Sequence, residues 1–328
     1  MNVDAQNYDT PVWPASLQQL SELQGQRLLA SVWSDFRALL TQEVIDLDVD
    51  MRQQLQRLYL PMAAWLAHQA DAQPLVLGIN GAQGSGKSTL AKILALLLEQ
   101  AFDKTVISVS IDDLYKTRAQ RRELAATVHP LLATRGVPGT HDVELGIDLL
   151  TRLKQGDISD LSLPVFDKAR DDRLPESDWI RVSAKPDIII FEGWCVGAVA
   201  ENETGLQQPI NELEASEDTD ASWRRFVNKQ LAGPYQELFN LIDVLLMLKI
   251  PGFDKVYEWR GLQEQKLQAS LQDSQQQTNN TMSEVELKRF IMHYERITRL
   301  TLNEMPSRAD VVLALNADHR IEQVSARA

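Results

Sequence analysis

Residues 81–88 have the spacing of a phosphate-binding loop. They read Gly-Ala-Gln-Gly-Ser-Gly-Lys-Ser and match the pattern G-x-x-x-x-G-K-[ST]. In this pattern, backbone N–H groups cradle phosphate oxygens, the lysine reaches the β- and γ-phosphates, and the final hydroxyl holds Mg²⁺. The alternative is a chance glycine-rich turn. We expect a nucleoside triphosphate, with Ser88 on the metal, to contact Gly81, Ala82, Gln83, Gly84, Ser85, Gly86, Lys87, Ser88 and Thr89.

The elements that must position this loop can be read on either side of it. Residues 74–79 form a short apolar run that is typical of a buried strand. Residues 89–100 repeat Leu90, Ile93, Leu94 and Leu97 on one face of a helix. The motif needs a strand before the loop and a helix N-terminus after it, because the helix dipole favours anions there. This context favours a phosphate site over a chance turn.

Polar side chains also follow other apolar runs of the sequence. Four such runs occur, at residues 105–111, 187–191, 243–250 and 310–315. Near-continuous apolar runs separated by helical segments are typical of a parallel sheet covered on both faces. Ligands of such sheets bind at the carboxyl ends of the strands. We therefore predict an α/β fold with a doubly wound parallel sheet, and a site that includes Asp112, Asp113, Glu192 and Asn316.

The composition is that of an ordinary globular protein, with 44% hydrophobic and 24% charged residues. The net charge is −13 and there is no long basic run, which argues against nucleic-acid and anionic-membrane partners. Cys195 is the single cysteine, so an internal disulfide is excluded and a zinc cluster is disfavoured. The sequence shows no membrane-length apolar segment and no signal peptide, which predicts a cytoplasmic protein.

Patterning along the chain divides it into a helical N-terminal addition, residues 1–72, and a main domain, residues 73–328. Leucines such as Leu17, Leu20 and Leu55 recur in the addition at helix-compatible spacing, without a recognisable motif. Residues 201–222 are acidic, and residues 268–283 are rich in Gln, Asn, Ser and Thr. Both segments are predicted to be mobile insertions of the main domain.

A phosphate loop alone does not separate kinases, GTPases and motor ATPases. GTPases carry Asn-Lys-x-Asp after a strand, whereas Asn228-Lys229 here lacks the aspartate and lies in a helical stretch. The Leu-Ser-Gly-Gly-Gln signature of transport ATPases is absent, as are the basic tracks expected of a helicase. These absences disfavour a GTPase, a transport ATPase and a helicase.

Five segments, in order, resemble those of plant-type D-glycerate 3-kinase and its bacterial and fungal relatives. They are Ser-Ile-Asp-Asp-Leu-Tyr at 110–115, Arg-Gly-Val-Pro-Gly-Thr-His-Asp at 135–142, Leu-Pro-Val-Phe-Asp-Lys-Ala at 163–169, Glu-Gly-Trp-Cys-Val-Gly at 192–197 and Val-Tyr-Glu-Trp-Arg at 256–260. The first segment also resembles that of uridine kinase and phosphoribulokinase, and the wider group includes pantothenate kinase. Leu114 stands where the family usually has phenylalanine.

This resemblance, which covers roughly residues 74–320, implies a P-loop kinase with a C-terminal helical lid. It implies transfer of the γ-phosphoryl group of ATP, with Mg²⁺, to a hydroxyl of a small metabolite, with D-glycerate as the expected acceptor. Kinases for a nucleoside, pantothenate or a sugar remain open, as does a switch protein that hydrolyses ATP slowly. The oligomeric state is not predicted.

Phosphoryl transfer needs positioning and charge neutralisation, which assigns roles to four residues. Lys87 is expected to reach the phosphates and Glu192 to hold Mg²⁺ or its water. Asp112 is the candidate base, or at least the group that orients the acceptor hydroxyl, with a helix N-cap as the alternative. Arg260, Arg296 and Arg299 are candidates for the arginine of the lid, with a plain surface position as the alternative, and Arg260 has the Trp-Arg context of the family.

Further residues are candidates for contacts with the two substrates. A carboxylate-bearing acceptor needs a cation, which lysine or arginine supplies. The expected acceptor contacts are Asp113, Tyr115, His141, Asp142, Asp167, Lys168, Arg173 and Arg296. The alternatives are caps at Asp113 and Asp142 and a solvated charge run around Asp167. Asn316 and His319, after the last strand, are expected near adenine, with a plain turn as the alternative.

Overall fold

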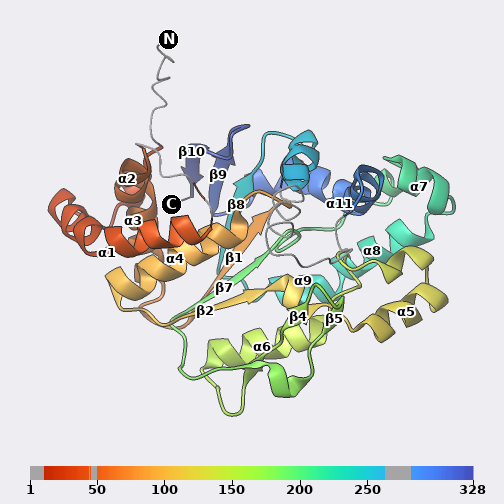
Figure 1. Ribbon diagram of the computed structural model, residues 1–328, viewed down its shortest axis with the longest axis horizontal. Helices are drawn as coiled ribbons and strands as arrows, with labels where there is room; N and C mark the ends of the chain where they lie inside the picture. Colours follow the sequence, from red (N-terminus) through yellow and green to blue (C-terminus); the bar gives the residue numbers. More distant parts are fainter. Residues whose placement is uncertain (1–10, 44, 46–49, 263–281, 328) are drawn as a thin grey trace, which may run out of the picture.

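The computed structural model describes residues 11–43, 45, 50–262 and 282–327. Within these residues, a six-stranded sheet has the order β10-β9-β8-β1-β7-β2 (Figure 1). Its strands are β1 (Leu75–Gly81), β2 (Val106–Ser110), β7 (Ile188–Gly193), β8 (Val244–Lys249), β9 (Val311–Leu315) and β10 (Ile321–Ala326). All neighbours are parallel except β10, which runs antiparallel to β9 at the edge. The predicted α/β fold is confirmed with a sheet that is mostly parallel, and the antiparallel edge strand departs from the parallel sheet that was predicted.

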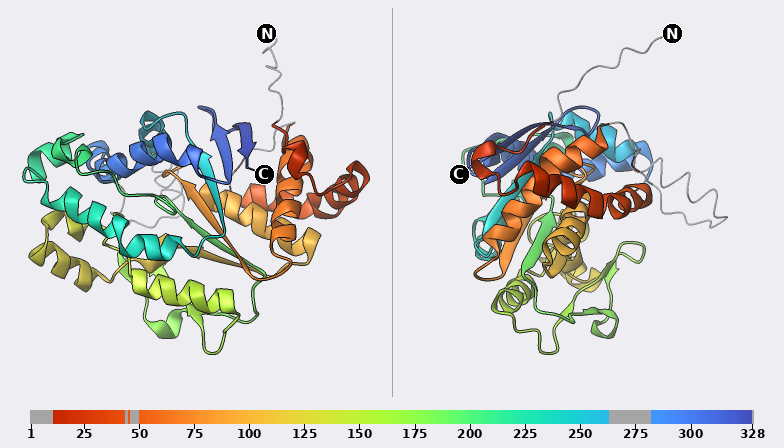
Figure 2. Two further views of the ribbon diagram at one scale, coloured as in Figure 1. Left: turned by 180° about the vertical axis from the view of Figure 1, so that it is seen from behind. Right: turned by 90° about the vertical axis from the view of Figure 1, so that its left-hand side faces the viewer.

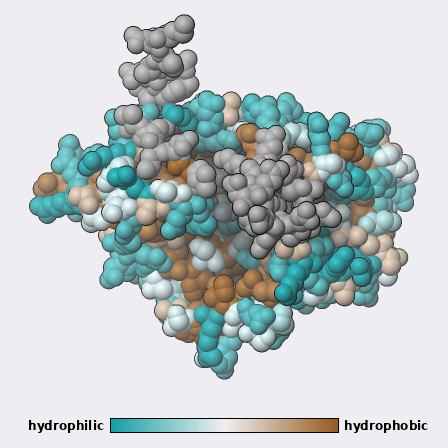
Figure 3. All heavy atoms as spheres, viewed as in Figure 1, coloured by the Kyte–Doolittle hydropathy of each residue, from teal (hydrophilic) through white to brown (hydrophobic). Residues whose placement is uncertain are grey.

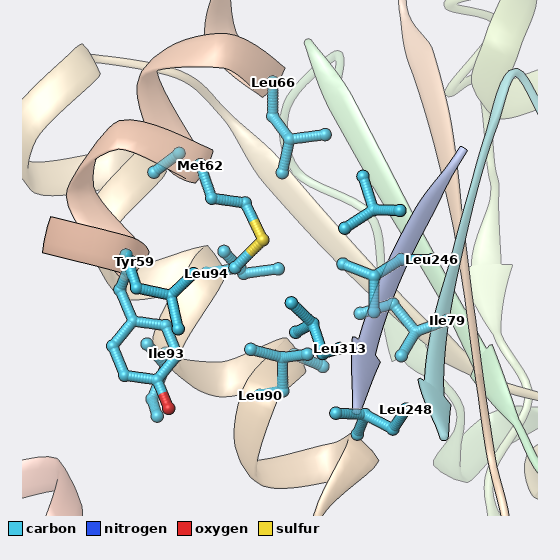
Figure 4. Packing of buried hydrophobic residues seen from close by; sticks show 14 of the residues in the cluster. Tyr59, Met62, Leu66, Ile79, Leu90, Ile93, Leu94, Leu246, Leu248 and Leu313 are labelled. Atoms are coloured by element: carbon cyan, nitrogen blue, oxygen red, sulfur yellow. The ribbon is translucent and has the colours of Figure 1, made fainter. Parts of the chain in front are cut away.

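Each face of the sheet has its own hydrophobic core. Alternate residues of β1, namely Leu75, Leu77 and Ile79, pack on one face with α1 (Glu22–Gln42), α3 (Leu60–Gln69) and α4 (Lys87–Phe102). In Figure 4, Met62 and Leu66 of α3 lie near Leu246 of β8 in this core. On the other face, Val76 joins α6 (Val143–Gln155), α8 (Ser222–Ala232) and α9 (Pro234–Phe239). Burial on both faces explains why the strands read as continuous apolar runs.

The N-terminal addition is helical where it is described. After η1 (Ala15–Leu17), α1 begins behind a capping box between Ser21 and Gln24. The elements α2 (Met51–Gln54), η2 (Leu55–Tyr59) and α3 follow one another directly, and η2 has the wider π-helical turn. Helices α1 and α3 lie against α4, as both views of Figure 2 show. The addition is therefore packed on the helix that follows the phosphate loop.

Further elements connect the strands of the sheet. They are η3 (Ile111–Leu114), α5 (Arg118–Thr127), η4 (Pro130–Ala133), η5 (Glu176–Asp178), η6 (Gly205–Gln207), α7 (Glu212–Glu217), α11 (Glu284–Glu304) and η7 (Met305–Ser307). Two small antiparallel pairs join β3 (Ser162–Leu163) to β6 (Ile180–Arg181) and β4 (Phe166–Asp167) to β5 (Asp172–Arg173). Residues 254–262 are helical as well.

The two predicted insertions have different outcomes. Residues 201–222 contain η6 and α7, and Asp218 in this segment forms a buried ion pair with Arg224 at 2.8 Å. These contacts do not fit a mobile insertion. Residues 268–283 lie outside the described residues except for 282 and 283.

Within the described part of the chain, no helix combines the length and apolar character needed to cross a bilayer. The face in Figure 3 is largely hydrophilic, and its apolar colour gathers around β2 and α6. Strand β2 is the edge of the sheet, with Val106 and Ile107 only half-buried.

Candidate active site

The phosphate loop connects the end of β1 to the start of α4. Gly81 closes the strand, and Lys87 is the first residue of the helix. Gly84 and Gly86 have φ values of 82° and 86°, in the left-handed region that favours glycine. A Cβ atom on Gly84 would also lie only 2.9 Å from Cβ of Trp259. The loop therefore has the strand–turn–helix context that the motif requires, and its N–H groups lie at a helix N-terminus.

Ser88 and Glu192 meet beside this loop. Ser88 Oγ donates a hydrogen bond to Glu192 Oε1 at 2.9 Å. The second carboxylate oxygen, Oε2, is buried and has no hydrogen-bond partner among the described residues. A hydroxyl and a carboxylate are hard oxygen donors of the kind that Mg²⁺ prefers, and this ion keeps waters and phosphate oxygens as its other ligands. The residues therefore fit Mg²⁺, even though the described chain contains no cluster of three or more acidic, histidine or cysteine ligands.

Asp112 lies between two cations at the end of β2. Tyr115 Oη donates to its Oδ1 at 2.8 Å, and Lys168 Nζ donates to its Oδ2 at 2.8 Å. Burial would raise the pKa of Asp112, but the charges of Lys168 and Lys87 and these hydrogen bonds lower it to about 2. The carboxylate is therefore ionised at neutral pH and can accept a hydrogen bond from a hydroxyl. It is not a helix cap, because Ser110 caps η3 and Thr117 caps α5.

Asp113, the neighbour of Asp112, serves a different contact. The backbone N–H of Phe166 in β4 donates to Asp113 Oδ1 at 3.1 Å. Burial, followed by smaller effects of neighbouring charges, raises the pKa of Asp113. The side chain thus joins η3 to the β4–β5 pair. This hydrogen bond is neither the expected contact with the acceptor nor the helix cap given as its alternative.

His141 is part of a buried wall behind Asp112. Its ring stacks on that of Tyr115 with centroids 4.6 Å apart, and its Nδ1 lies 2.6 Å from Tyr235 Oη. Burial lowers the pKa of His141 to about 3, so the imidazole is neutral at physiological pH. Its Nε2 is buried without a hydrogen-bond partner among the described residues. The neutral ring can support Tyr115 but brings no positive charge to the site.

Two of the residues expected to contact the acceptor instead form a helix cap and a turn. Asp142 caps α6 by accepting from Leu145 N at 3.3 Å, and its Oδ2 accepts from Arg173 Nη1 at 3.0 Å. Asp167 accepts from the backbone N–H groups of residues 169 and 170 within its own turn. The alternative of a cap is therefore correct for Asp142, and both carboxylates are committed to backbone donors. Arg173 lies next to the site with one of its bonds directed to Asp142.

The expected acceptor role of Arg296 does not agree with its contacts. Its guanidinium bonds to the carboxylates of Glu214 and Glu201 and to the backbone carbonyls of residues 205 and 208. These bonds occupy all five N–H donors of the arginine. Arg296 therefore holds the segment with η6 and α7 against α11, and we correct its assignment to a structural one. Arg299 pairs with Glu295 at 2.8 Å.

Trp259 contacts both the phosphate loop and the turn at residues 316–320, which is the expected adenine loop. Its ring stacks on His319 with centroids 3.8 Å apart, and its Nε1 donates to the carbonyl of Ala317 at 3.3 Å. Asn316 Oδ1 accepts from the backbone N–H groups of residues 318 and 320, so this residue closes the turn. Arg260 follows Trp259. Its positive charge acts to lower the pKa of Tyr294, whereas burial has the larger effect and raises that pKa. Trp259 and the backbone of Arg260 thus lie beside Gly84, His319 stacks on Trp259, and Asn316 forms the turn given as its alternative.

Several residues that shape the site were not among the candidates. Tyr235 accepts from Gly139 N at 3.0 Å, and Trp194 Nε1 donates to Gly136 O at 3.0 Å. Arg135 pairs with Asp171 and lies over the ring of Phe166. Together these contacts fix the 135–142 segment. Arg135 and Trp194 stand in the segments that resemble the kinases, and this was the signal that could have identified them.

Comparison with known proteins agrees with this geometry. No protein-family model matches the chain. An uncharacterized kinase of Schizosaccharomyces pombe is 34% identical over 238 residues, which cover 68% of this chain and 79% of the relative. The chloroplastic D-glycerate 3-kinase of Arabidopsis thaliana is 28% identical over 300 residues, 84% of this chain and 61% of the plant protein. The structure of D-glycerate 3-kinase from Cryptococcus neoformans has a TM-score of 0.68 at 23% identity, covering 82% of this chain and 97% of that one.

The relatives share the kinase class, and the solved structure shares the fold. The match to the S. pombe kinase extends over two thirds of the chain at an identity that establishes common family membership. The chain therefore belongs to the P-loop kinases of the D-glycerate 3-kinase group and is an ATP-dependent phosphotransferase that acts on a hydroxyl.

Proposed function

We propose that this kinase phosphorylates D-glycerate with Mg-ATP, and that Asp112 orients the reacting hydroxyl. The observation that carries the proposal is the ionised Asp112 carboxylate, which lies within the electrostatic reach of Lys87 and 2.8 Å from Lys168. A hydroxyl that donates to Asp112 would lie next to the lysine that reaches the γ-phosphate. This neighbourhood supports in-line transfer between the two.

The charges around Asp112 support a small anionic acceptor. Lys168, Arg173 and Arg135 belong to, or pair with, the loops that border this carboxylate. A short hydroxy acid could place its hydroxyl on Asp112 and its carboxylate on one of these cations, because charge-assisted pairs are the strongest available contacts. Lys168 is the best placed of them, with a side chain that is 63% exposed. The glycerate kinases among the relatives favour the same acceptor.

In the proposed mechanism, the chain itself contributes binding, orientation and charge. Lys87 and the loop N–H groups hold the phosphates, and Ser88 with Glu192 would hold Mg²⁺, which neutralises charge on the phosphates when bound. Asp112 accepts a hydrogen bond from the acceptor hydroxyl and receives its proton late, as expected for a carboxylate of low pKa. Arg260, beside Gly84, is the proposed lid cation. Trp259 and His319 would border the adenine.

The experiment that tests this function measures ADP release with Mg-ATP over an acceptor panel. The panel contains D-glycerate, pantothenate, uridine and a hexose, with Lys87→Ala as the inactive control. We expect D-glycerate alone to raise ADP release well above the buffer rate in the wild-type enzyme. Equal rates with glycerate and with buffer would contradict the proposed acceptor. ATP binding with no stimulation by any acceptor would instead favour the switch protein.

A further inference from the structure

The N-terminal addition contacts the nucleotide site directly through Glu43. This residue follows the last turn of α1, a helix that lies against α4 (Figures 1 and 2). Its Oε2 accepts a hydrogen bond from Thr89 Oγ1 at 3.2 Å, and its Oε1 accepts from Lys92 Nζ at 2.6 Å. The Glu43 side chain is only 19% exposed. Thr89 directly follows Ser88 and belongs to the proposed phosphate-binding loop.

A second contact reaches the other side of the same site. Arg320 Nη1 lies 3.7 Å from Asp50 Oδ2, and Arg320 ends the turn that carries His319. His319 in turn stacks on Trp259 beside Gly84. Glu43 thus touches the helix after the phosphate loop, and Asp50 touches the expected adenine loop. The addition is attached to the nucleotide site at two independent points.

The contact of Glu43 with Thr89 should oppose the binding of phosphate at this site. A threonine hydroxyl has one proton, so Thr89 cannot donate to Glu43 and to a phosphate oxygen at once. The carboxylate also places a negative charge at the N-terminal turn of α4, where the helix dipole favours anions such as phosphate. The ion pair with Lys92 offsets part of this charge. Both effects make Glu43 a competitor of the nucleotide.

We propose that Glu43 is a positioning residue by which the N-terminal addition weakens nucleotide binding at the P-loop. It does so by holding the Thr89 hydroxyl and by keeping a negative charge beside the phosphates. This inference rests on the proposed function, because it requires a nucleotide at residues 81–89. It concerns the affinity for ATP and ADP, and it is independent of which acceptor the enzyme uses.

The test is calorimetric titration of Mg-ATP and Mg-ADP into the full-length wild-type protein, Glu43→Gln and Glu43→Ala. Asp35→Asn is the matched control, because Asp35 is an exposed carboxylate on the same helix α1. We expect both Glu43 variants to bind nucleotide about twofold to fivefold more tightly, the size of a charge effect at a helix N-terminus. Asp35→Asn should bind like the wild type. The gain of Glu43→Gln should shrink as salt screens the charge.

A third variant separates the hydroxyl from the charge. In a Thr89→Val background, Glu43→Ala should gain less affinity than in the wild-type background, because no hydroxyl is left to be released. Unchanged or weaker nucleotide binding by both Glu43 variants would overturn the inference while the proposed function stands. Absence of Mg-ATP binding by the wild-type protein would overturn the proposed function and this inference with it.

Discussion

At the scale of single residues, the site depends on one carboxylate held between cations. Asp112 is half-buried, which favours its neutral form, yet the lysines at positions 168 and 87 lower its pKa to about 2. A group of such low pKa is a weak base, so its main contribution is to orient the hydroxyl and to accept a proton late in the transfer. The same cations that keep it ionised are available to the acceptor and the phosphates.

The first prediction concerns the removal of this charge. Asp112→Asn should lower kcat by about 10²- to 10⁴-fold, since it removes the proton acceptor. The Kd for Mg-ATP should change little, because the phosphate loop is untouched. Steady-state kinetics and calorimetry measure the two quantities separately. Near-normal turnover in this variant would assign the acceptor hydroxyl to another group.

The second prediction concerns the pH dependence that Lys168 imposes. Because Lys168 lowers the pKa of Asp112, Lys168→Met should raise that pKa. Asp112 would then take up its proton at a higher pH, so kcat/KM of the variant should begin to fall at a higher pH than that of the wild type as the solution is acidified. The KM for the acceptor should rise as well. Superimposable pH–kcat/KM profiles would contradict the role given to Lys168.

At the scale of elements, the sequence predicted best what is local. The strand, loop and helix around residues 81–88 follow from glycine spacing and from helical periodicity within about thirty residues. Asp112 and Glu192 were found because each follows an apolar run of the sequence, and β2 and β7 lie side by side with Ser110 opposite Glu192. These signals need no knowledge of distant contacts.

Contacts between segments that are distant in the sequence could not be predicted from it. Tyr294 donates to the carbonyl of Arg135, 159 positions away, and Tyr235 meets His141 across 94 positions. The β4–β5 pair consists of two-residue strands, which are too short to show a period of two. Asp142 illustrates a further limit, because a cap and a ligand contact use the same residue type.

The third prediction belongs to the contact between α7 and α11. Arg296 has a side chain that is 11% exposed and is paired with Glu214, which is 1% exposed. Arg296→Met leaves that glutamate buried without its partner and should lower the free energy of unfolding by about 3–5 kcal/mol. Arg299→Met, on the same helix but 52% exposed, should cost about 1 kcal/mol or less. Urea denaturation measures both.

One result would contradict the structural role assigned to Arg296. If Arg296→Met kept full stability but raised the KM for the acceptor tenfold or more, the arginine would be an acceptor contact after all. Equal losses of stability in the two variants would show that the buried pair is no stronger than the exposed one.

At the scale of the whole molecule, two cores on opposite faces of the sheet hold the site at the carboxyl ends of the strands. The N-terminal helices complete one core together with α4, and α6, α8 and α9 complete the other (Figure 1). The second core also buries two neutral histidines, His141 and His293, with burial lowering their pKa values to about 3 and about 4. The folded state therefore favours the uncharged form of these rings.

The fourth prediction is a loss of stability in mild acid. Both histidine pKa values lie below the ordinary value of 6.5, so the unfolded chain binds more protons between pH 6.5 and pH 4. Their contribution to stability is complete above pH 6.5 and is lost as the pH falls through this range. The Tm should be level from pH 8 to 7 and then decline. His293→Gln should flatten the decline, and an equally steep profile would contradict this account.

The most direct test of the central claim is a crystal structure with Mg²⁺, a non-hydrolysable ATP analogue and D-glycerate. The account predicts the triphosphate on residues 81–89, the metal at Ser88, and the glycerate hydroxyl within hydrogen-bond distance of Asp112 with its carboxylate on Lys168, Arg173 or Arg135. If the glycerate is bound elsewhere while Lys168 remains on Asp112, the proposed acceptor site is wrong.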